Sequence, residues 1–152
     1  MALPNIFTKP VSEKVIARID RLTPVTKPQW GKMNASQMLA HCNVTYEMLY
    51  ENKHPKPNAF IKFILKVFVK KLVVTEVPYK KGGATAPAFV MTGDKDFELE
   101  KKSLINYIQK TQMLGEAEFD GKESPSFGPL TVNEWNNMFY KHINHHLTQF
   151  SV

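Results

Sequence analysis

Apolar residues recur at spacings of three and four along most of the chain, and this periodicity predicts α-helices. No segment shows the strict alternation of apolar and polar residues that is typical of a half-exposed strand. Helices are expected over 13–22, 34–51, 59–73, 95–114 and 131–150. One short helix followed by four long helices predicts an all-α fold, a four-helix bundle with a short extra N-terminal helix.

Polar residues that can cap a helix stand at the start of each predicted segment. Asn34 is followed by Gln37, and Thr131 by Glu134, at the spacing of a capping box. In a capping box, each side chain accepts a hydrogen bond from the backbone of the other residue, so both helix starts are well specified. Single caps are expected for the other helices at Ser12, Asn58 and Asp94.

The predicted helix 59–73 is apolar around more of its circumference than a surface helix needs. Its apolar residues are Phe60, Ile61, Phe63, Ile64, Leu65, Val67 and Phe68. Such a wide arc fits a helix that packs on a second subunit, and it fits equally the central helix of the bundle. The first alternative predicts a homodimer.

The length of 152 residues favours one domain over residues 1–152. Segment 74–93 is the least regular part of the chain, with Pro78, Pro87 and the Gly82-Gly83 pair. A loop of this length in a compact domain is usually functional or mobile.

The net charge of +6 raises the question of nucleic-acid binding. The lysines are spread along the chain and no basic segment is interleaved with aromatic residues, so a solvated basic surface is favoured and a nucleic-acid partner is not expected. No apolar run reaches membrane-spanning length, and the N-terminus lacks the pattern of a signal peptide. With Cys42 as the single cysteine, these features predict a cytoplasmic protein without a membrane partner.

Three of the five histidines, His142, His145 and His146, stand on the last predicted helix. His142 and His146 fall on its apolar stripe, one turn and about 40° apart, so that the two imidazoles can share one metal ion. His145 lies about 60° from His142 in the other direction, at the edge of the stripe. Spacing alone leaves His142 and His145 open as an alternative ligand pair.

A third histidine, His41, stands on the second long helix. It can reach the other two if that helix and the last one run antiparallel. Cys42 is about 100° around the helix from His41, so both are not expected to reach one ion. Cys42 is therefore interpreted as a small buried hydrophobic residue.

The sequence gives weaker indications of a role in ligand binding for several other polar and aromatic residues. Glu47 and Tyr46 are candidates to orient a ligand, whereas His54, among prolines, is not expected to bind one. We expect Trp30, in a loop, to close the end of the core rather than to contact a substrate.

The segment from His142 to Gln149 has the form H-x-x-H-H-x-x-Q, and with Trp30 to Cys42 it resembles an uncharacterised branch of the DinB/YfiT-like superfamily of metalloenzymes. The resemblance implies a four-helix bundle, often dimeric, with a metal ion held by three histidines. Carried to this chain, the ligands are His41, His142 and His146, and His145 is a neighbour. Gln149 matches the glutamine of the signature, whereas Leu147-Thr148 replaces the arginine-glycine pair that often precedes it.

Two functions are open at this point. In the first, three imidazoles bind a divalent metal, nickel or zinc, and leave a fourth position for water or a small-molecule substrate. Characterised relatives include transferases and isomerases that use low-molecular-weight thiols, so the resemblance implies a possible thiol-dependent S-transferase-like activity. The alternative is a non-catalytic module that binds a metal or dimerises.

Overall fold

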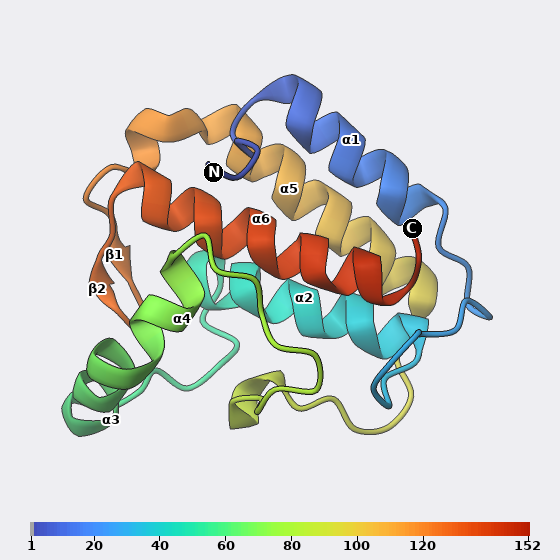
Figure 1. Ribbon diagram of the computed structural model, residues 1–152, viewed down its shortest axis with the longest axis horizontal. Coiled ribbons are helices and arrows are strands. Elements are labelled where there is room, and N and C mark those ends of the chain that lie inside the picture. Colours follow the sequence, from blue (N-terminus) through green and yellow to red (C-terminus); the bar gives the residue numbers. More distant parts are fainter. Residues whose placement is uncertain (1) are drawn as a thin grey trace.

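The computed structural model describes residues 2–152, and these residues are mostly helical, as predicted. Four helices pack lengthwise against one another (Figure 1): α1 (Lys9–Asp20), α2 (Ala35–Tyr50), α5 (Phe97–Phe119) and α6 (Val132–Gln149). α6 crosses the middle of the molecule, with α1 and α5 on one side and α2 on the other (Figure 1).

The predicted caps explain where most helices begin. Both capping boxes are present, at Asn34 for α2 and at Thr131 for α6. The predictions were wrong for two helices. α1 begins at Lys9 rather than at 13, because Pro10 is tolerated in a first turn, where its missing N–H has no partner to lose. α5 begins at Phe97, after a cap by Asp96 rather than Asp94.

The core is built on aromatic side chains of α6. Trp135 and Phe139 are fully buried and stack with ring centroids 5.3 Å apart. Phe119 meets both rings edge-on, at 5.5 and 5.6 Å. It reaches them because α5 is interrupted at Gly115, close to its predicted end at 114. Gly115 takes a φ of 73°, in the left-handed region that glycine adopts without strain.

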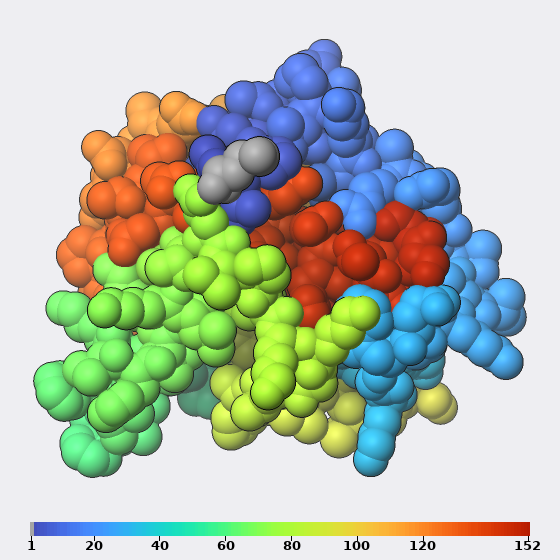
Figure 2. All heavy atoms as spheres, viewed as in Figure 1, coloured from blue at the N-terminus to red at the C-terminus, as the bar shows by residue number. Residues whose placement is uncertain are grey.

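The predicted helix 59–73 is not the central helix of the bundle, which corrects one of the two alternatives. Residues 58–74, which we call the arm, form α3 (Ala59–Ile64), the π-helix η1 (Leu65–Val69) and α4 (Lys70–Val74). The arm lies at one corner of the molecule (Figures 1 and 2). α1, predicted as an extra helix, takes the fourth place in the bundle instead, because its residues Val15 and Ile19 are buried in the core.

The two long connections differ in regularity. Segment 75–96 is mostly irregular, close to the prediction for 74–93, and contains one short 3-10 helix, η2 (Pro87–Phe89). The connection after α5 contains strands that were not predicted, β1 (Glu123–Ser124) and β2 (Gly128–Pro129), paired antiparallel. Strands of two residues are too short to show an alternation of apolar and polar residues in the sequence. None of the helices formed by residues 2–152 is long and apolar enough to cross a lipid bilayer.

Candidate metal centre

α2 and α6 run antiparallel, as the placement of the three histidines requires. Tyr46, late in α2, stacks on Phe139 of α6 with ring centroids 5.1 Å apart. His41, one turn earlier in α2, lies 4.6 Å from the ring of His146, further along α6. The antiparallel pairing therefore brings His41 to the same end of the bundle as His142 and His146.

The three imidazoles form one compact cluster. One ring nitrogen from each of His41, His142 and His146 lies within 4.8 Å of the other two. The Nε2 atoms of His41 and His142 are 3.0 Å apart. Tetrahedral ligation at about 2.0–2.1 Å sets ligand nitrogens roughly 3.3 Å apart, so small side-chain rotations would adapt the cluster to one ion. No carboxylate of the described residues joins it.

Each Nδ1 atom of the cluster has a partner outside it. Nδ1 of His41 lies 2.8 Å from the carbonyl oxygen of Phe89 and donates to it. Nδ1 of His146 lies 2.8 Å from the side-chain oxygen of Gln149. Nδ1 of His142 lies 3.1 Å from the hydroxyl of Thr45. These contacts leave the Nε2 atoms free to act as ligands, which is how metal-binding histidines are usually held.

The Nε2–Nε2 contact between His41 and His142 constrains where the protons lie. Because the Phe89 carbonyl takes the Nδ1 proton of His41, the Nε2 atom of a neutral His41 carries a lone pair. At 3.0 Å, its neighbour on His142 must offer it a proton, or a cation must lie between the two. Thr45 permits both arrangements, because its hydroxyl can donate to Nδ1 of His142 or accept from it.

Burial keeps these imidazoles neutral. His41 and His146 are only 5% and 8% exposed, and desolvation lowers the pKa of both. The pKa of His146 falls to about 3, with a further contribution from His41. Desolvation and the neighbouring histidines place the pKa of His142 well below its ordinary value. Neutral imidazoles at pH 7 are the form that binds metal.

Gln149 joins the cluster to the loop before α2. Its side-chain nitrogen donates to the carbonyl oxygen of Trp30 at 2.6 Å, and its oxygen accepts from His146. A β-carbon at position 31 would stand 2.7 Å from that nitrogen, and Gly31 has a φ of 84°. Position 31 therefore requires glycine for two reasons: a side chain would clash with Gln149, and the backbone is in the left-handed region.

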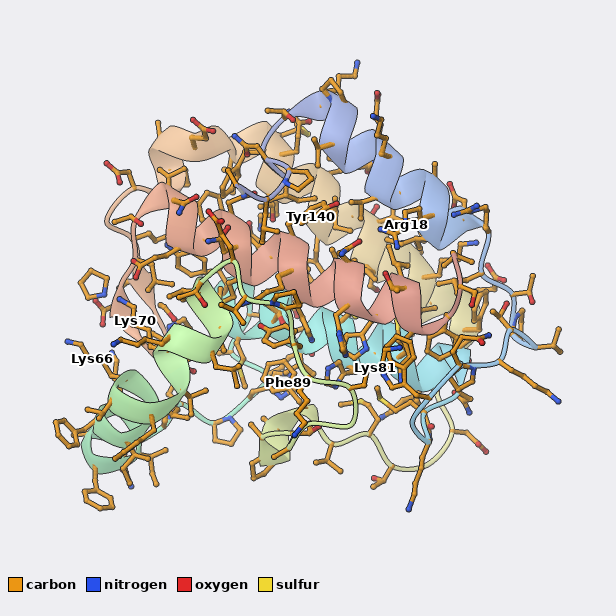
Figure 3. The ribbon with its side chains drawn as sticks, viewed as in Figure 1. Arg18, Lys66, Lys70, Lys81, Phe89 and Tyr140 are labelled. Atoms are coloured by element: carbon orange, nitrogen blue, oxygen red, sulfur yellow. The ribbon has the colours of Figure 1, made fainter. Side chains whose placement is uncertain are left out.

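Aromatic residues from two loops form a wall beside the cluster. Phe89 lies 5.4 Å from the ring of His41, and Tyr79 lies 6.4 Å from the ring of His142. The ring of Trp30 meets that of His145 edge-on, with centroids 5.7 Å apart. The ammonium of Lys81 lies 4.3 Å from the centre of the Trp30 ring. Figure 3 shows Phe89 and Lys81 on the side of α6 that faces α2.

Two expectations concern residues at this wall, Trp30 and His145. Trp30 is partly exposed and borders the histidines, which corrects the expectation that it closes the end of the core. His145 contacts Trp30, Tyr79 and His146 but does not belong to the cluster of possible ligands. The structure thus favours His142 with His146 over His142 with His145 as the pair on α6.

Residues 6–152 match the family described as "Protein of unknown function (DUF1569)". The chain belongs to this family. No curated protein and no solved structure matches it. The DinB/YfiT-like resemblance gains no support from these comparisons, and the DUF1569 description carries no activity. Function must therefore be argued from the geometry of the site.

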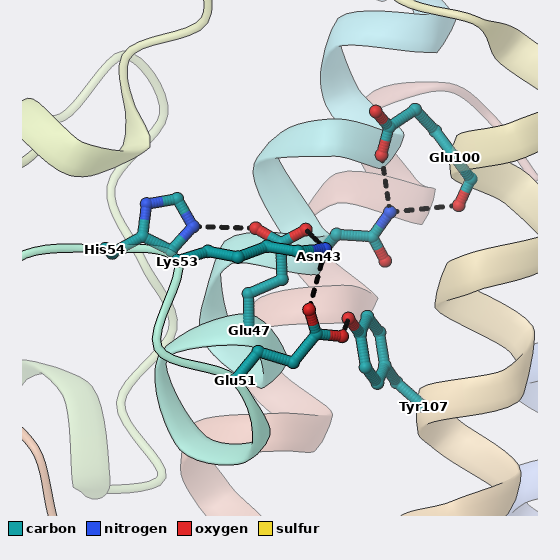
Figure 4. A network of polar contacts seen from close by, with 7 residues as sticks. All are labelled: Asn43, Glu47, Glu51, Lys53, His54, Glu100 and Tyr107. Atoms are coloured by element: carbon teal, nitrogen blue, oxygen red, sulfur yellow. Dashed lines mark hydrogen bonds and ion pairs between the residues drawn. The ribbon is translucent and has the colours of Figure 1, made fainter.

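Some candidates in this DUF1569 protein lie outside the cluster. The carboxylate of Glu47 binds His54 at 2.6 Å and Lys53 at 3.4 Å, in a network that continues through Glu51 to Tyr107 (Figure 4). Tyr46 is buried between the rings of Tyr107 and Phe139. Neither Glu47 nor Tyr46 is therefore placed to orient a ligand.

Cys42 is 1% exposed, which confirms its assignment to the core, and burial raises the pKa of its thiol.

The sequence analysis named Gln149 but did not identify Thr45 or the carbonyl of Phe89, which also position the DUF1569 cluster. Thr45 could have been found, because it follows His41 by four residues and so shares its face of α2. Gln149 follows His146 by three residues, a spacing that also predicts contact. The carbonyl of Phe89 gave no signal, since a backbone group in a long irregular loop has no sequence signature.

Proposed function

We propose that this protein is a metal-dependent enzyme in which His41, His142 and His146 bind one divalent ion. The observation that carries the proposal is the outward hydrogen bond of each Nδ1 atom, to Phe89, Gln149 and Thr45. With Nδ1 of each ring held from outside the cluster, the Nε2 atoms of His41 and His142 face each other at 3.0 Å, where a metal ion would take up their lone pairs. Three protein ligands leave a fourth position for water or substrate, as in catalytic zinc sites.

Nickel or zinc is the ion that this ligand set favours. All three ligands are imidazoles, which bind zinc, copper, iron and nickel, whereas magnesium and calcium require oxygen ligands. The absence of a carboxylate among the ligands, within the described residues, supports an ion of the first group. Such an ion would supply Lewis acidity and lower the pKa of a bound water or thiol.

The residues around the cluster indicate a small substrate with an apolar part. Trp30, Tyr79 and Phe89 offer ring faces and edges. Basic groups also lie at this wall: His145, Lys81 over the ring of Trp30 and Lys141 over the ring of Tyr79. The DinB/YfiT-like resemblance supports a low-molecular-weight thiol as a co-substrate and an S-transferase-like reaction. It likewise supports a DinB-like bundle formed by a single domain over residues 1–152.

A non-catalytic metal-binding module is the second candidate, and one observation favours it. His41 and His146 are only 5% and 8% exposed, so the side chains around the cluster leave little of it open to a substrate. If the wall of aromatic rings does not open, the ion would serve stability or partner binding rather than turnover.

Metal analysis of protein without a histidine tag tests the proposal. We expect about one nickel or zinc per chain in the purified protein, and a loss of that metal in His142→Ala. Cobalt substitution then separates the two candidates, because an open ligand position changes the visible spectrum when a thiol or azide binds. A spectrum that no small ligand alters would support the non-catalytic module, and a protein that binds no divalent ion would rule out both.

A further inference from the structure

A short part of the loop before α5 lies on the face of α2 that carries a proposed ligand. Residues 83–92, which we call the strap, stand between Gly82 and Gly93 and include η2. The strap contacts α2 and runs below it in the view of Figure 1. Residues 83–92 are all exposed or partly exposed. The strap therefore contributes little to the core and can move without disrupting it.

Two hydrogen bonds hold the strap against α2. The carbonyl oxygen of Phe89 accepts from Nδ1 of His41 at 2.8 Å. The carbonyl oxygen of Gly93, where the strap ends, accepts from the side-chain nitrogen of Gln37 at 3.0 Å. Residues four apart lie on the same face of a helix, so Gln37 and His41 present both donors on one face of α2. The strap thus follows this face in the opposite direction to α2, and its last bond is one turn from a proposed ligand.

The strap also covers part of the cluster. The ring of Phe89 has its centroid 5.4 Å from that of His41 and 6.0 Å from that of His142. His41 itself is only 5% exposed. With the strap in this position a substrate has little access to the histidines, so a catalytic site at this place must open before it can bind one.

Two glycines mark the points at which the strap can turn. Gly82 and Gly93 have φ angles of 66° and 70°, in the left-handed region. A β-carbon on either residue would meet no atom within 4 Å, so the space around both is open. Glycine changes its backbone conformation at little cost because it has no side chain. The chain between Gly82 and Gly93 can therefore swing as one piece.

The chain is fastened with unequal strength on the two sides of the strap. Before the strap, the buried ammonium of Lys141 donates to the carbonyl oxygens of Leu72 and Thr75. After it, the bond to Gly93 comes from the neutral and partly exposed side chain of Gln37. A bond from a charged, buried donor is stronger than a neutral bond that water can replace. Opening is therefore expected to begin at Gln37.

We propose that Gln37 is a positioning residue of the metal site, which latches the strap over the cluster, and that release of this latch lets the strap swing away and admit a substrate. The inference rests on the proposed function, because a lid matters only to a site that exchanges ligands. It adds to that function the moving part, its two pivots and the residue that controls it. Gln37 acts through Gly93 and the strap, not as a ligand.

Amide hydrogen exchange of the metal-free protein tests the latch. In Gln37→Glu, the carboxylate can still accept from the backbone N–H of Asn34, as Gln37 does in the capping box, but it cannot donate to Gly93. We expect the amides of Phe89 and Val90, which donate within the strap, to exchange about fivefold faster. The amides of α2 should keep their wild-type rates. Gln109→Glu, the same change at an exposed position of α5, is the control and should alter neither set.

Cobalt-loaded protein tests whether the strap controls access to the site. Azide should change the visible spectrum of Gln37→Glu about fivefold faster than that of the wild type, because the open form is more populated without the latch. Gln109→Glu should react at the wild-type rate. A purely structural role of Gln37 in capping α2 would not produce this difference.

Two outcomes would overturn the proposal. One is a folded Gln37→Glu protein in which Phe89 and Val90 exchange at the wild-type rate, or in which the amides of α2 accelerate equally, since Gln37 would then serve only its helix. The other is faster exchange in the strap without faster azide binding, which would show that the strap does not cover the open ligand position.

Two further results remain decisive. If Gln37→Glu lacks the helical circular dichroism of the wild type, Gln37→Ala replaces it with the same expectations, because its backbone N–H still donates to the side chain of Asn34. If the protein binds no divalent ion, the proposed function fails, whereas exchange in the metal-free protein still decides whether Gln37 holds the strap.

Discussion

Nδ1 of His146 donates to the side-chain oxygen of Gln149, 2.8 Å away and three residues further along α6. The same glutamine side chain donates to the carbonyl of Trp30 at 2.6 Å. Gln149 therefore fixes the ring of a proposed ligand and ties it to the loop that precedes α2. Partners of this kind set the orientation and the tautomer of metal-binding histidines.

Gln149→Ala should weaken metal binding about 10- to 100-fold without changing the stoichiometry, because His146 keeps its nitrogen but loses its fixed orientation. Chelator competition on metal-loaded protein measures the affinity. Gln109→Ala, at an exposed position of α5, is the control and should behave as wild type. Equal affinities for Gln149→Ala and wild type would show that this hydrogen bond does not position the ligand.

The three proposed ligands should differ sharply from the neighbouring histidine. His41→Ala, His142→Ala and His146→Ala should each abolish tight binding, because two imidazoles hold a divalent ion far less well than three. His145→Ala should retain the metal, with an affinity or activity lowered by at most about 10- to 100-fold if His145 acts through its neighbours.

Metal content and the thermal midpoint with and without chelator, measured for all four histidine variants, check this ranking, since a ligand that binds only the folded state stabilises it. His54→Ala is the control, because His54 pairs with Glu47 outside the cluster. If His145→Ala lost its metal while His146→Ala kept it, the ligand pair on α6 would be His142 with His145.

The metal-free protein should lose stability as the pH falls. The folded pKa of His146, about 3, lies below its unfolded value of about 6.5, so the unfolded chain binds more protons between these values. Its contribution is complete above about pH 7 and decreases toward pH 3, with about 2 kcal/mol lost between pH 7 and pH 5.

Urea unfolding of chelator-treated protein at pH 7 and pH 5 measures this loss, and His41 and His142, whose pKa values are also lowered, should add to it. His146→Gln should show a smaller decrease in the free energy of unfolding, because the titrating group is gone. The same decrease in both proteins would mean that other groups cause the pH dependence.

Lys141→Met should loosen the segment that carries the aromatic wall. The ammonium of Lys141 is buried on α6 and donates to the carbonyl oxygens of Leu72, at 2.8 Å, and Thr75. These bonds fasten the end of α4, where the wall segment begins, and a bond from a charged group is worth about 1.5–3 kcal/mol.

We expect a loss of about 2–3 kcal/mol in the free energy of unfolding of Lys141→Met, with faster amide hydrogen exchange in residues 75–93. Lys102→Met, on the surface of α5, is the control. Unchanged exchange in residues 75–93 would show that Lys141 does not hold this segment.

The sequence by itself determined the all-α character, the starts of α2 and α6, and the placement of His142 and His146 on one helical stripe. These features depend on neighbours three or four residues apart. The capping boxes at Asn34 and Thr131 are complete within one turn, and each needs no contact from elsewhere in the chain. The start of α1 was missed because Ser12 was expected as its cap, whereas the helix begins at Lys9 and includes Pro10 in its first turn.

Only the tertiary structure decided which helices form the bundle and how the cluster is held. The apolar arc of 59–73 suited a core position, but Glu123 and Glu134 pair with its lysines and turn that arc outward. The convergence of His41 on His142 depends on the packing of helices about 100 residues apart in the sequence. The carbonyl that holds His41 belongs to an irregular loop, and its position follows from the folding of the whole chain, which local periodicity does not encode.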